Sequence, residues 1–373
     1  MPGDPAAPFP RWADRAGVMV MGAELASASL PGRMQASLVG EWRQAGPAQQ
    51  FAYLAGGALM LAGVAHGAAW LVAGGAWEGP VSFRKPTTFG LSFGLTTITL
   101  AWVTGWLRVT GRTRWLLLGP LAVADATEVA WVAAQRARGV ASHFNFTTTL
   151  DAALFVVGGA AIAVTVTVIV AVTVLAFIRM QAAPSMAVAI RAGLVILLVA
   201  QGVGGWMIGH GVGPASDGVT QGLTTVAPTG VMKVPHAVAM HAIQVLPALA
   251  WLASFADLAE RRRLWLVWTA AAGYGALVAV AVAQTAAGRA PFDLGAAVAT
   301  LSLMGVALLG AAYTAALLAL RRGGLHLTSR QPGPARVGQA TQQGTATYQS
   351  DRELFDRRRR ATSGARRCKE TKR

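Results

Sequence analysis

Long apolar stretches alternate with short polar breaks along most of the chain. A helix needs about 20 apolar residues to cross the ~30 Å hydrocarbon core of a bilayer. Eight stretches reach this length, at residues 51–77, 86–107, 115–135, 150–178, 187–209, 234–256, 264–286 and 294–320. The pattern therefore predicts an all-α integral membrane protein, a bundle of about eight transmembrane helices that forms a multi-pass protein of the cell membrane.

The rest of the chain lies before and after these stretches. We expect residues 1–50 to form a loose or surface-lying segment, because they are rich in Pro, Gly and Ala. No signal peptide is expected there, since VMVMG at 18–22 is too short for its apolar core and Glu24 follows closely. Residues 51–322 form the predicted transmembrane bundle, and residues 323–373 are expected to be a basic, disordered tail.

Composition agrees with contact to a lipid bilayer. Charged residues make up only 13% of the 373 residues, whereas soluble domains contain about 25%. The chain has a net charge of +16, but residues 321–373 alone hold 14 Lys or Arg against 4 Asp or Glu. Because the positive charge is concentrated there, without a basic face rich in aromatic residues, nucleic acid is not an expected partner.

The end of the tail, DRRRRATSGARRCKETKR at 356–373, has the composition of a segment that binds anionic lipid. An unselected, disordered extension has the same composition, and we favour that interpretation. The single cysteine, Cys368, also lies there, so disulfides and iron–sulfur clusters within the chain are excluded by count. The sequence leaves the oligomeric state open.

The distribution of Lys and Arg predicts which side of the membrane each break faces. One set of breaks holds nine arginines, namely Arg108, Arg112, Arg114, Arg179, Arg261, Arg262, Arg263, Arg321 and Arg322. The opposite set holds six Lys or Arg, so both termini are expected to be cytoplasmic. The external breaks contain most of the other polar side chains and lie at residues 78–86, 135–151, 209–219 and 288–293. We therefore expect the functional site in the external half of the bundle.

Ionisable residues interrupt several apolar stretches at similar depth. At 1.5 Å per residue, His241 and Glu128 lie roughly 10 Å below the external ends of their helices, and His66 lies roughly 16 Å below. Asp125 and Glu128 are three residues apart and therefore share a helix face. Carboxylates this deep are rare and usually line a cavity, pair with a base or bind an ion. His236 and His241 are five residues apart, so at least one of them needs a partner on another helix.

Two kinds of cofactor site are consistent with these residues. Haem b requires two imidazoles from different helices, and His66 with His241 is the pair whose depth best allows it. The variant is a non-haem iron, copper or zinc site centred on Glu128. Its further ligands would be His210, His236 and His241, and His143 in the external break completes the candidate metal ligands.

Four basic residues lie at the same external breaks: Arg84, Lys85, Arg136 and Arg138. Together they would form a cationic collar that could hold haem propionates, an anionic substrate or a lipid headgroup. A purely structural role is the alternative, because long basic side chains also anchor helix ends at the membrane surface. Asp151 or a preceding Thr would similarly cap the helix that begins near residue 150.

This arrangement favours a metal- or haem-dependent membrane oxidoreductase, with Glu128 and Asp125 as candidate catalytic residues. A proton- or ion-coupled transporter would use the same carboxylates and histidines as a relay, although no internal repeat is visible. The third possibility is a non-catalytic membrane partner or assembly factor whose Arg-rich tail docks on acidic lipid. In that case the histidines would only link neighbouring helices through hydrogen bonds.

Four blocks of the chain resemble a known family. WEGPVSFRKPTTFGLSFG (77–94), RGVASHFNFTTTLD (138–151), GHGVG (209–213) and VPHAVAMHAIQVLP (234–247) are similar to blocks in a family of uncharacterised bacterial multi-span membrane proteins. The resemblance covers roughly residues 60–320 and leaves both ends of the chain outside it. It implies the multi-helix architecture and no particular activity.

Overall fold

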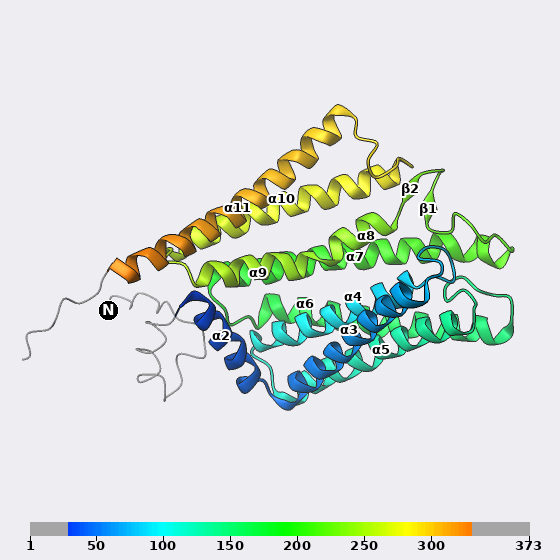
Figure 1. Ribbon diagram of the computed structural model, residues 1–373, viewed down its shortest axis with the longest axis horizontal. Coiled ribbons are helices and arrows are strands. Elements are labelled where there is room, and N and C mark those ends of the chain that lie inside the picture. Colours follow the sequence, from blue (N-terminus) through cyan, green and yellow to red (C-terminus); the bar gives the residue numbers. More distant parts are fainter. Residues whose placement is uncertain (1–28, 330–373) are drawn as a thin grey trace, which may run out of the picture. The chain divides into compact units, whose positions relative to one another are not determined.

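The computed structural model describes residues 29–329, with side chains described up to residue 322. This part of the chain is almost entirely helical (Figure 1). The helices are α2 (Leu30–Gln44), α3 (Pro47–Ala73), α4 (Arg84–Gly105), α5 (Gly111–Ala137), α6 (Thr149–Ile178), α7 (Pro184–Ser216), α8 (Lys233–Met240), α9 (Ala242–Ser254), α10 (Glu260–Ala286) and α11 (Ala296–Ser329). Strands β1 (Thr225–Val226) and β2 (Gly230–Val231) pair in one short antiparallel hairpin. The predicted all-α bundle is confirmed.

Seven helical segments of the described chain are long and apolar enough to cross a membrane: α3, α5, α6, α7, Lys233–Ser254 (α8 and α9), α10 and Ala296–Arg322 of α11. The eighth predicted span, 86–107, corresponds to α4, which has 22 residues but is too polar to belong to this set. Its polarity comes largely from buried threonines, including Thr87, Thr96, Thr97 and Thr104. Because α4 packs between α3 and α5, these threonines face protein rather than lipid.

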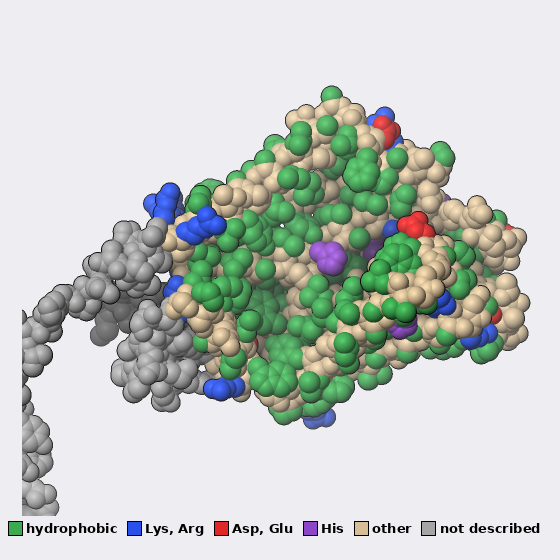
Figure 2. All heavy atoms as spheres, viewed as in Figure 1, with side chains coloured by type: hydrophobic (Ala, Val, Ile, Leu, Met, Phe, Trp, Pro, Cys, Tyr) green, Lys and Arg blue, Asp and Glu red, His purple; other side chains and the backbone are tan. Residues whose placement is uncertain are grey.

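The outer surface of the bundle is hydrophobic, as contact with a bilayer requires. Large apolar side chains are widely exposed, with Leu61 and Leu303 each 70% exposed and Val72 90% exposed. Figure 2 shows hydrophobic side chains over the middle of the face in view, while charged side chains gather towards the ends of the helices. A soluble protein rarely exposes an apolar surface of this extent, so the described helices contact lipid.

Local sequence explains where α2 begins, and the structure corrects two expected boundaries. The Ser29 hydroxyl oxygen accepts the backbone N–H of Gly32 at 3.4 Å and so caps α2. Because α2 occupies residues 30–44, the segment expected to be loose is helical in this part. α11 likewise continues to Ser329, past the predicted start of the tail. Residues 1–28 and 330–373, which include the polybasic segment and Cys368, lie outside the described residues.

The described helices pack in two groups. Helices α3, α4, α5 and α6 pack on one another, and α7 packs on α8, α9 and α10. Helices α6 and α7 make the principal contact between the groups. α11 joins the second group, since the Tyr313 hydroxyl donates to the backbone oxygen of Val245 in α9 at 2.6 Å. The core extends through both groups, and Leu118, Ile190 and Leu246 within it are each 0% exposed.

Glycines allow α3 and α4 to approach closely. Gly56 and Gly63 of α3 lie against Gly94 and Gly90 of α4. A Cβ atom at Gly56 would lie 2.7 Å from the backbone oxygen of Gly94, and one at Gly90 would lie 2.7 Å from Gly63 Cα. Backbone-to-backbone packing of this kind is a common basis of helix association in membranes. It fixes the position of α4, which contributes several residues to the polar site.

Candidate functional site

Asp125 connects three helices at the centre of the first group. Its side chain is 0% exposed on α5. One carboxylate oxygen accepts a hydrogen bond from Thr97 Oγ1 of α4 at 2.6 Å, and the other accepts one from Thr165 Oγ1 of α6 at 2.7 Å. Both oxygens are therefore satisfied, which offsets much of the cost of burying a carboxyl group in an apolar bundle.

Glu128 lies one turn further along the same face of α5 and is 1% exposed. Its Oε1 atom lies 3.5 Å from His143 Nε2. Its Oε2 atom is buried and has no hydrogen-bond partner among the described residues. A buried carboxylate oxygen without a partner carries a substantial desolvation cost. Of the two carboxylates Asp125 and Glu128, Glu128 is therefore the one with an oxygen available to a proton or a ligand.

His143 comes from the loop 138–148 between α5 and α6 and completes a polar chain to the loop surface. Its Nδ1 atom lies 3.0 Å from Ser142 Oγ. Lys85 at the start of α4 donates to the same hydroxyl at 3.5 Å. The contacts therefore form a continuous series from Lys85 through Ser142 and His143 to Glu128.

Aromatic side chains enclose the imidazole of His143. Its ring centroid lies 4.9 Å from that of Trp131, 5.4 Å from that of Phe89, and 6.5 Å from those of Phe144 and Phe155. As a result the His143 side chain is only 21% exposed, although it lies in a loop. Phe144 adopts a φ of 55°, which residues other than glycine rarely do, so the surrounding contacts must hold this part of the loop.

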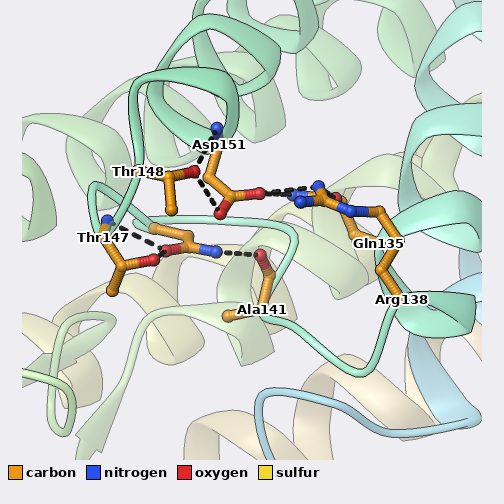
Figure 3. A network of polar contacts seen from close by, with 7 residues as sticks. Gln135, Arg138, Ala141, Thr147, Thr148 and Asp151 are labelled. Atoms are coloured by element: carbon orange, nitrogen blue, oxygen red, sulfur yellow. Dashed lines mark hydrogen bonds and ion pairs between the residues drawn. The ribbon is translucent and has the colours of Figure 1, made fainter.

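Figure 3 shows the polar network that holds the loop in place. Asp151 in the first turn of α6 is 2% exposed. Its Oδ1 atom accepts from Gln135 Nε2 at 3.0 Å and pairs with Arg138 at 2.7 Å. Its Oδ2 atom accepts from the Thr148 hydroxyl at 2.7 Å, and the same hydroxyl oxygen accepts the Asp151 backbone N–H at 3.1 Å. The carboxylate thereby ties the end of α5 to the start of α6.

A second set of contacts braces the loop internally. Asn145 donates to the backbone oxygen of Ala141 at 3.1 Å, and its own side-chain oxygen accepts from the Thr147 backbone at 3.2 Å and hydroxyl at 2.7 Å (Figure 3). Thr148 provides the side-chain cap of α6, as expected for a threonine at this position. Both networks surround the short segment that carries Ser142 and His143, so they position the imidazole against Glu128.

The four basic residues of the predicted collar have different surroundings. Arg138 is withdrawn from the collar by its ion pair with Asp151. The Arg136 guanidinium carbon lies 3.8 Å from the centre of the Phe83 ring, and Arg84 Nε lies 4.0 Å from Glu78 Oε1. Lys85 contacts Ser142. Arg84, Lys85 and Arg136 thus have no short ion pair among the described residues, and Lys85 alone of them contacts the polar chain.

The other histidines are held mainly by backbone carbonyls. Nδ1 of His66 lies 2.8 Å from the Ala62 oxygen of its own helix. Nδ1 of His236 lies 2.8 Å from the Ala200 oxygen of α7, so this histidine has the interhelical partner that its spacing demands. His210 Nε2 lies 3.1 Å from the Thr225 oxygen. His241 is exposed at the break between α8 and α9.

Within the described part of the chain, no three His, Cys, Asp or Glu side chains lie close enough together to hold a metal ion. Glu128 therefore does not share a three-ligand group with His210, His236 and His241. The pair that the structure does bring together is Glu128 with His143, a residue that the sequence places in a polar loop. The haem and metal assignments stay predictions.

Three residues at this site were not identified from the sequence: Thr97, Thr165 and Ser142. Threonine in an apolar helix usually donates to its own backbone, as Thr99 does to the Leu95 oxygen at 2.7 Å. Sequence spacing does not show which threonine instead faces a carboxylate on another helix. The SH pair in SHFNFTTTLD was the available signal for Ser142, because a serine next to a histidine is well placed to contact its ring nitrogen.

Comparisons with protein-family models, with curated proteins and with solved structures find no match. The resemblance of the four sequence blocks to a family of multi-span membrane proteins therefore stays a prediction. What the protein does has to be argued from the geometry of the site.

Proposed function

We propose that the protein is a proton-coupled membrane carrier in which Glu128 and His143 exchange a proton. The observation that supports this most is the 3.5 Å contact between the two side chains, together with the buried, unpartnered second oxygen of Glu128. Histidine is a common proton shuttle in proteins. A carboxyl group beside it inside a membrane bundle is a common element of proton pathways.

Polar groups on both sides of the pair fit this role. On the loop side, Ser142 links His143 to Lys85. Towards the interior, Asp125 lies one helical turn from Glu128, with Thr97 and Thr165 donating to it. In this scheme His143 passes protons between the expected external surface and Glu128. Asp125 supplies a second buried carboxyl group that responds to the charge on Glu128.

The same geometry gives less support to a metal-dependent oxidoreductase. Transition-metal sites in proteins usually have three or more His, Cys, Asp or Glu ligands. At Glu128 the described residues supply one imidazole and one carboxylate in contact, a combination that supports the proposed proton exchange. We therefore prefer the carrier among the functions that the sequence left open.

Replacing Glu128 with glutamine is expected to remove a titrating carboxyl group from the bundle interior. The amide keeps the shape of the side chain but cannot take up or release a proton. Infrared difference spectra of the purified protein, recorded across a pH titration, should lose one buried carboxyl band in Glu128→Gln. His143→Gln should keep that band but shift its frequency, because the carboxyl group loses its imidazole neighbour. Glu260→Gln, near the opposite end of the bundle, serves as the matched control.

The transport step is tested in proteoliposomes with an acidic exterior and a pH-sensitive dye inside. Candidate solutes are added one at a time, and proton entry is followed. We expect one solute class to increase proton entry in the wild type and in Glu260→Gln but not in Glu128→Gln. Equal proton entry in the wild type and Glu128→Gln for every solute, with unchanged infrared bands, would show that the proposal is wrong.

One observation keeps haem ligation as a second candidate. A carbonyl oxygen only accepts hydrogen bonds, so the Nδ1 atoms of His66 and His236 carry the proton and their Nε2 atoms keep a free lone pair. Metal-binding histidines are oriented in this way. For a haem protein we expect a Soret band and stoichiometric iron in the purified wild type. We expect their loss in His66→Ala and in either His236→Ala or His241→Ala, the latter being the partner predicted from the sequence. A colourless, folded wild type without bound metal would exclude this candidate.

A further inference from the structure

A cluster of positive charge forms where the two groups of helices meet at the expected external end. Arg84 and Lys85 begin α4, and Lys233 begins α8. Lys233 lies close enough to both Arg84 and Lys85 for their charges to interact. The residues come from distant parts of the sequence, so only folding brings them together. Like charges repel one another, so such a cluster is unfavourable unless an anion offsets the positive charge.

The described acidic side chains offset this charge only weakly. Glu78 is the carboxylate that interacts with the cluster, and its side chain is 80% exposed. Its closest approach to Arg84 Nε is 4.0 Å, which is too long for a hydrogen bond. An exposed ion pair at this distance contributes little free energy. Among the described residues, one exposed carboxylate therefore faces three cations.

Two guanidinium nitrogens near the cluster also lack partners. Nε of Arg84 and Nε of Arg136 are buried and have no hydrogen-bond partner among the described residues. Arg136 lies over the ring of Phe83, the residue just before Arg84. Partly buried N–H donors of this kind gain most from a charged acceptor, because guanidinium and oxyanion groups form short, directional hydrogen bonds. Lys233 is exposed, so the cluster is open to an incoming ligand.

We propose that Arg84, Lys85 and Lys233 form a binding site for a phosphate-type oxyanion, carried either by a free solute or by a lipid headgroup. A tetrahedral oxyanion offers several oxygens and can accept from a guanidinium and two ammonium groups at once. Because the cluster joins α4 to α8, a bound anion would also link the two groups of helices. The site differs from the collar predicted from the sequence, since Arg138 is engaged by Asp151 and Lys233 takes its place.

The position of the anion site also links it to transport, an inference that rests on the proposed carrier function. Lys85 donates to Ser142, and Ser142 contacts His143. An anion on Lys85 would therefore lie two contacts from the Glu128–His143 pair, so its binding can be coupled to proton exchange there. In the case of a free solute, the substrate class of the carrier is an anionic, phosphate-bearing compound.

Binding is measured on the purified full-length protein in nanodiscs of zwitterionic lipid. Inorganic phosphate is titrated by calorimetry at constant ionic strength, since surface charges are screened by salt. We expect saturable binding that weakens on the order of tenfold in Lys85→Gln and in Lys233→Gln, the loss expected for one charged hydrogen bond. Lys233 is exposed, so its replacement should leave folding intact. Arg261→Gln, an exposed arginine near the opposite end of the bundle, should bind like the wild type.

A parallel native mass spectrometry experiment identifies the source of the anion. Retention of phosphatidylglycerol by the wild type and its loss in Lys233→Gln, without binding of inorganic phosphate, would support a headgroup site. Binding of phosphate alone would support a solute site. Binding of neither, or equal binding by the wild type and both lysine variants, would overturn the proposal. Phosphate binding that is intact in Glu128→Gln, without coupled proton entry in the wild type, would refute the carrier but leave the anion site standing.

Discussion

Gly56→Leu is expected to destabilise the protein severely, whereas Gly57→Leu next to it should be tolerated. A Cβ atom at Gly56 would lie 2.7 Å from the Gly94 oxygen and 2.7 Å from a side-chain carbon of Ile98. The Gly94 oxygen belongs to the α4 backbone, so it cannot move aside as a flexible side chain would. Overpacking costs about 1–3 kcal/mol even where side chains can adjust, and we expect the loss here to reach at least ~3 kcal/mol.

Gly57 provides a closely matched control. A Cβ atom there would meet nothing within 4 Å, and the residue is exposed on the outer surface of α3. A leucine at this position would face lipid. Thermal unfolding in detergent, followed by size-exclusion chromatography, compares the two variants with the wild type. Similar unfolding temperatures for both variants would mean that α3 and α4 do not pack through these glycines.

Asp151→Ala is expected to have the second-largest effect, on both stability and the site. The substitution leaves Gln135, Arg138 and Thr148 without their common acceptor at the end of α5 and the start of α6. Removing one member of a buried pair usually costs 3–5 kcal/mol. Because the Arg138 side chain is 39% exposed, water compensates it in part, and we expect a smaller loss of stability than this and than that of Gly56→Leu.

The local consequence of Asp151→Ala should be greater mobility of the loop that carries His143. Hydrogen–deuterium exchange in residues 138–148 should accelerate, and the infrared signature of the Glu128–His143 pair should change with it. Asp217→Ala, at an exposed acidic residue after α7, should alter neither observation. Unchanged exchange in the loop of Asp151→Ala would mean that the Asn145 contacts suffice to hold it.

The helices of the bundle follow closely from the sequence. Residue hydropathy is a local property, and a helix that meets lipid must be apolar over its whole exposed length. α4 was placed correctly, yet it is not apolar enough to belong with the other spans, because buried threonines take the place of lipid-facing side chains. The helix at 30–44 was missed for a different reason, since its residues are too mixed in polarity to show an apolar stretch.

The candidate site, too, could be predicted from the sequence only in part. The three-residue spacing of Asp125 and Glu128 was sufficient to place both on one buried face of α5, since helical periodicity fixes the faces within a helix. Their partners could not be found in that way. Thr97, Thr165 and His143 come from two other helices and a loop, and their contacts depend on how those elements pack.

The sequence by itself determined the membrane-helix architecture, the buried carboxylates of α5 and the cap of α6, because each depends on residues close together in the chain. The tertiary structure alone decided that His143 meets Glu128, that Arg138 is engaged by Asp151, and that Lys233 joins Arg84 and Lys85. Long polar side chains have many possible partners at similar energy. Which partner they reach depends on the distance between packed helices and on the rotation of each helix. A short stretch of sequence determines neither.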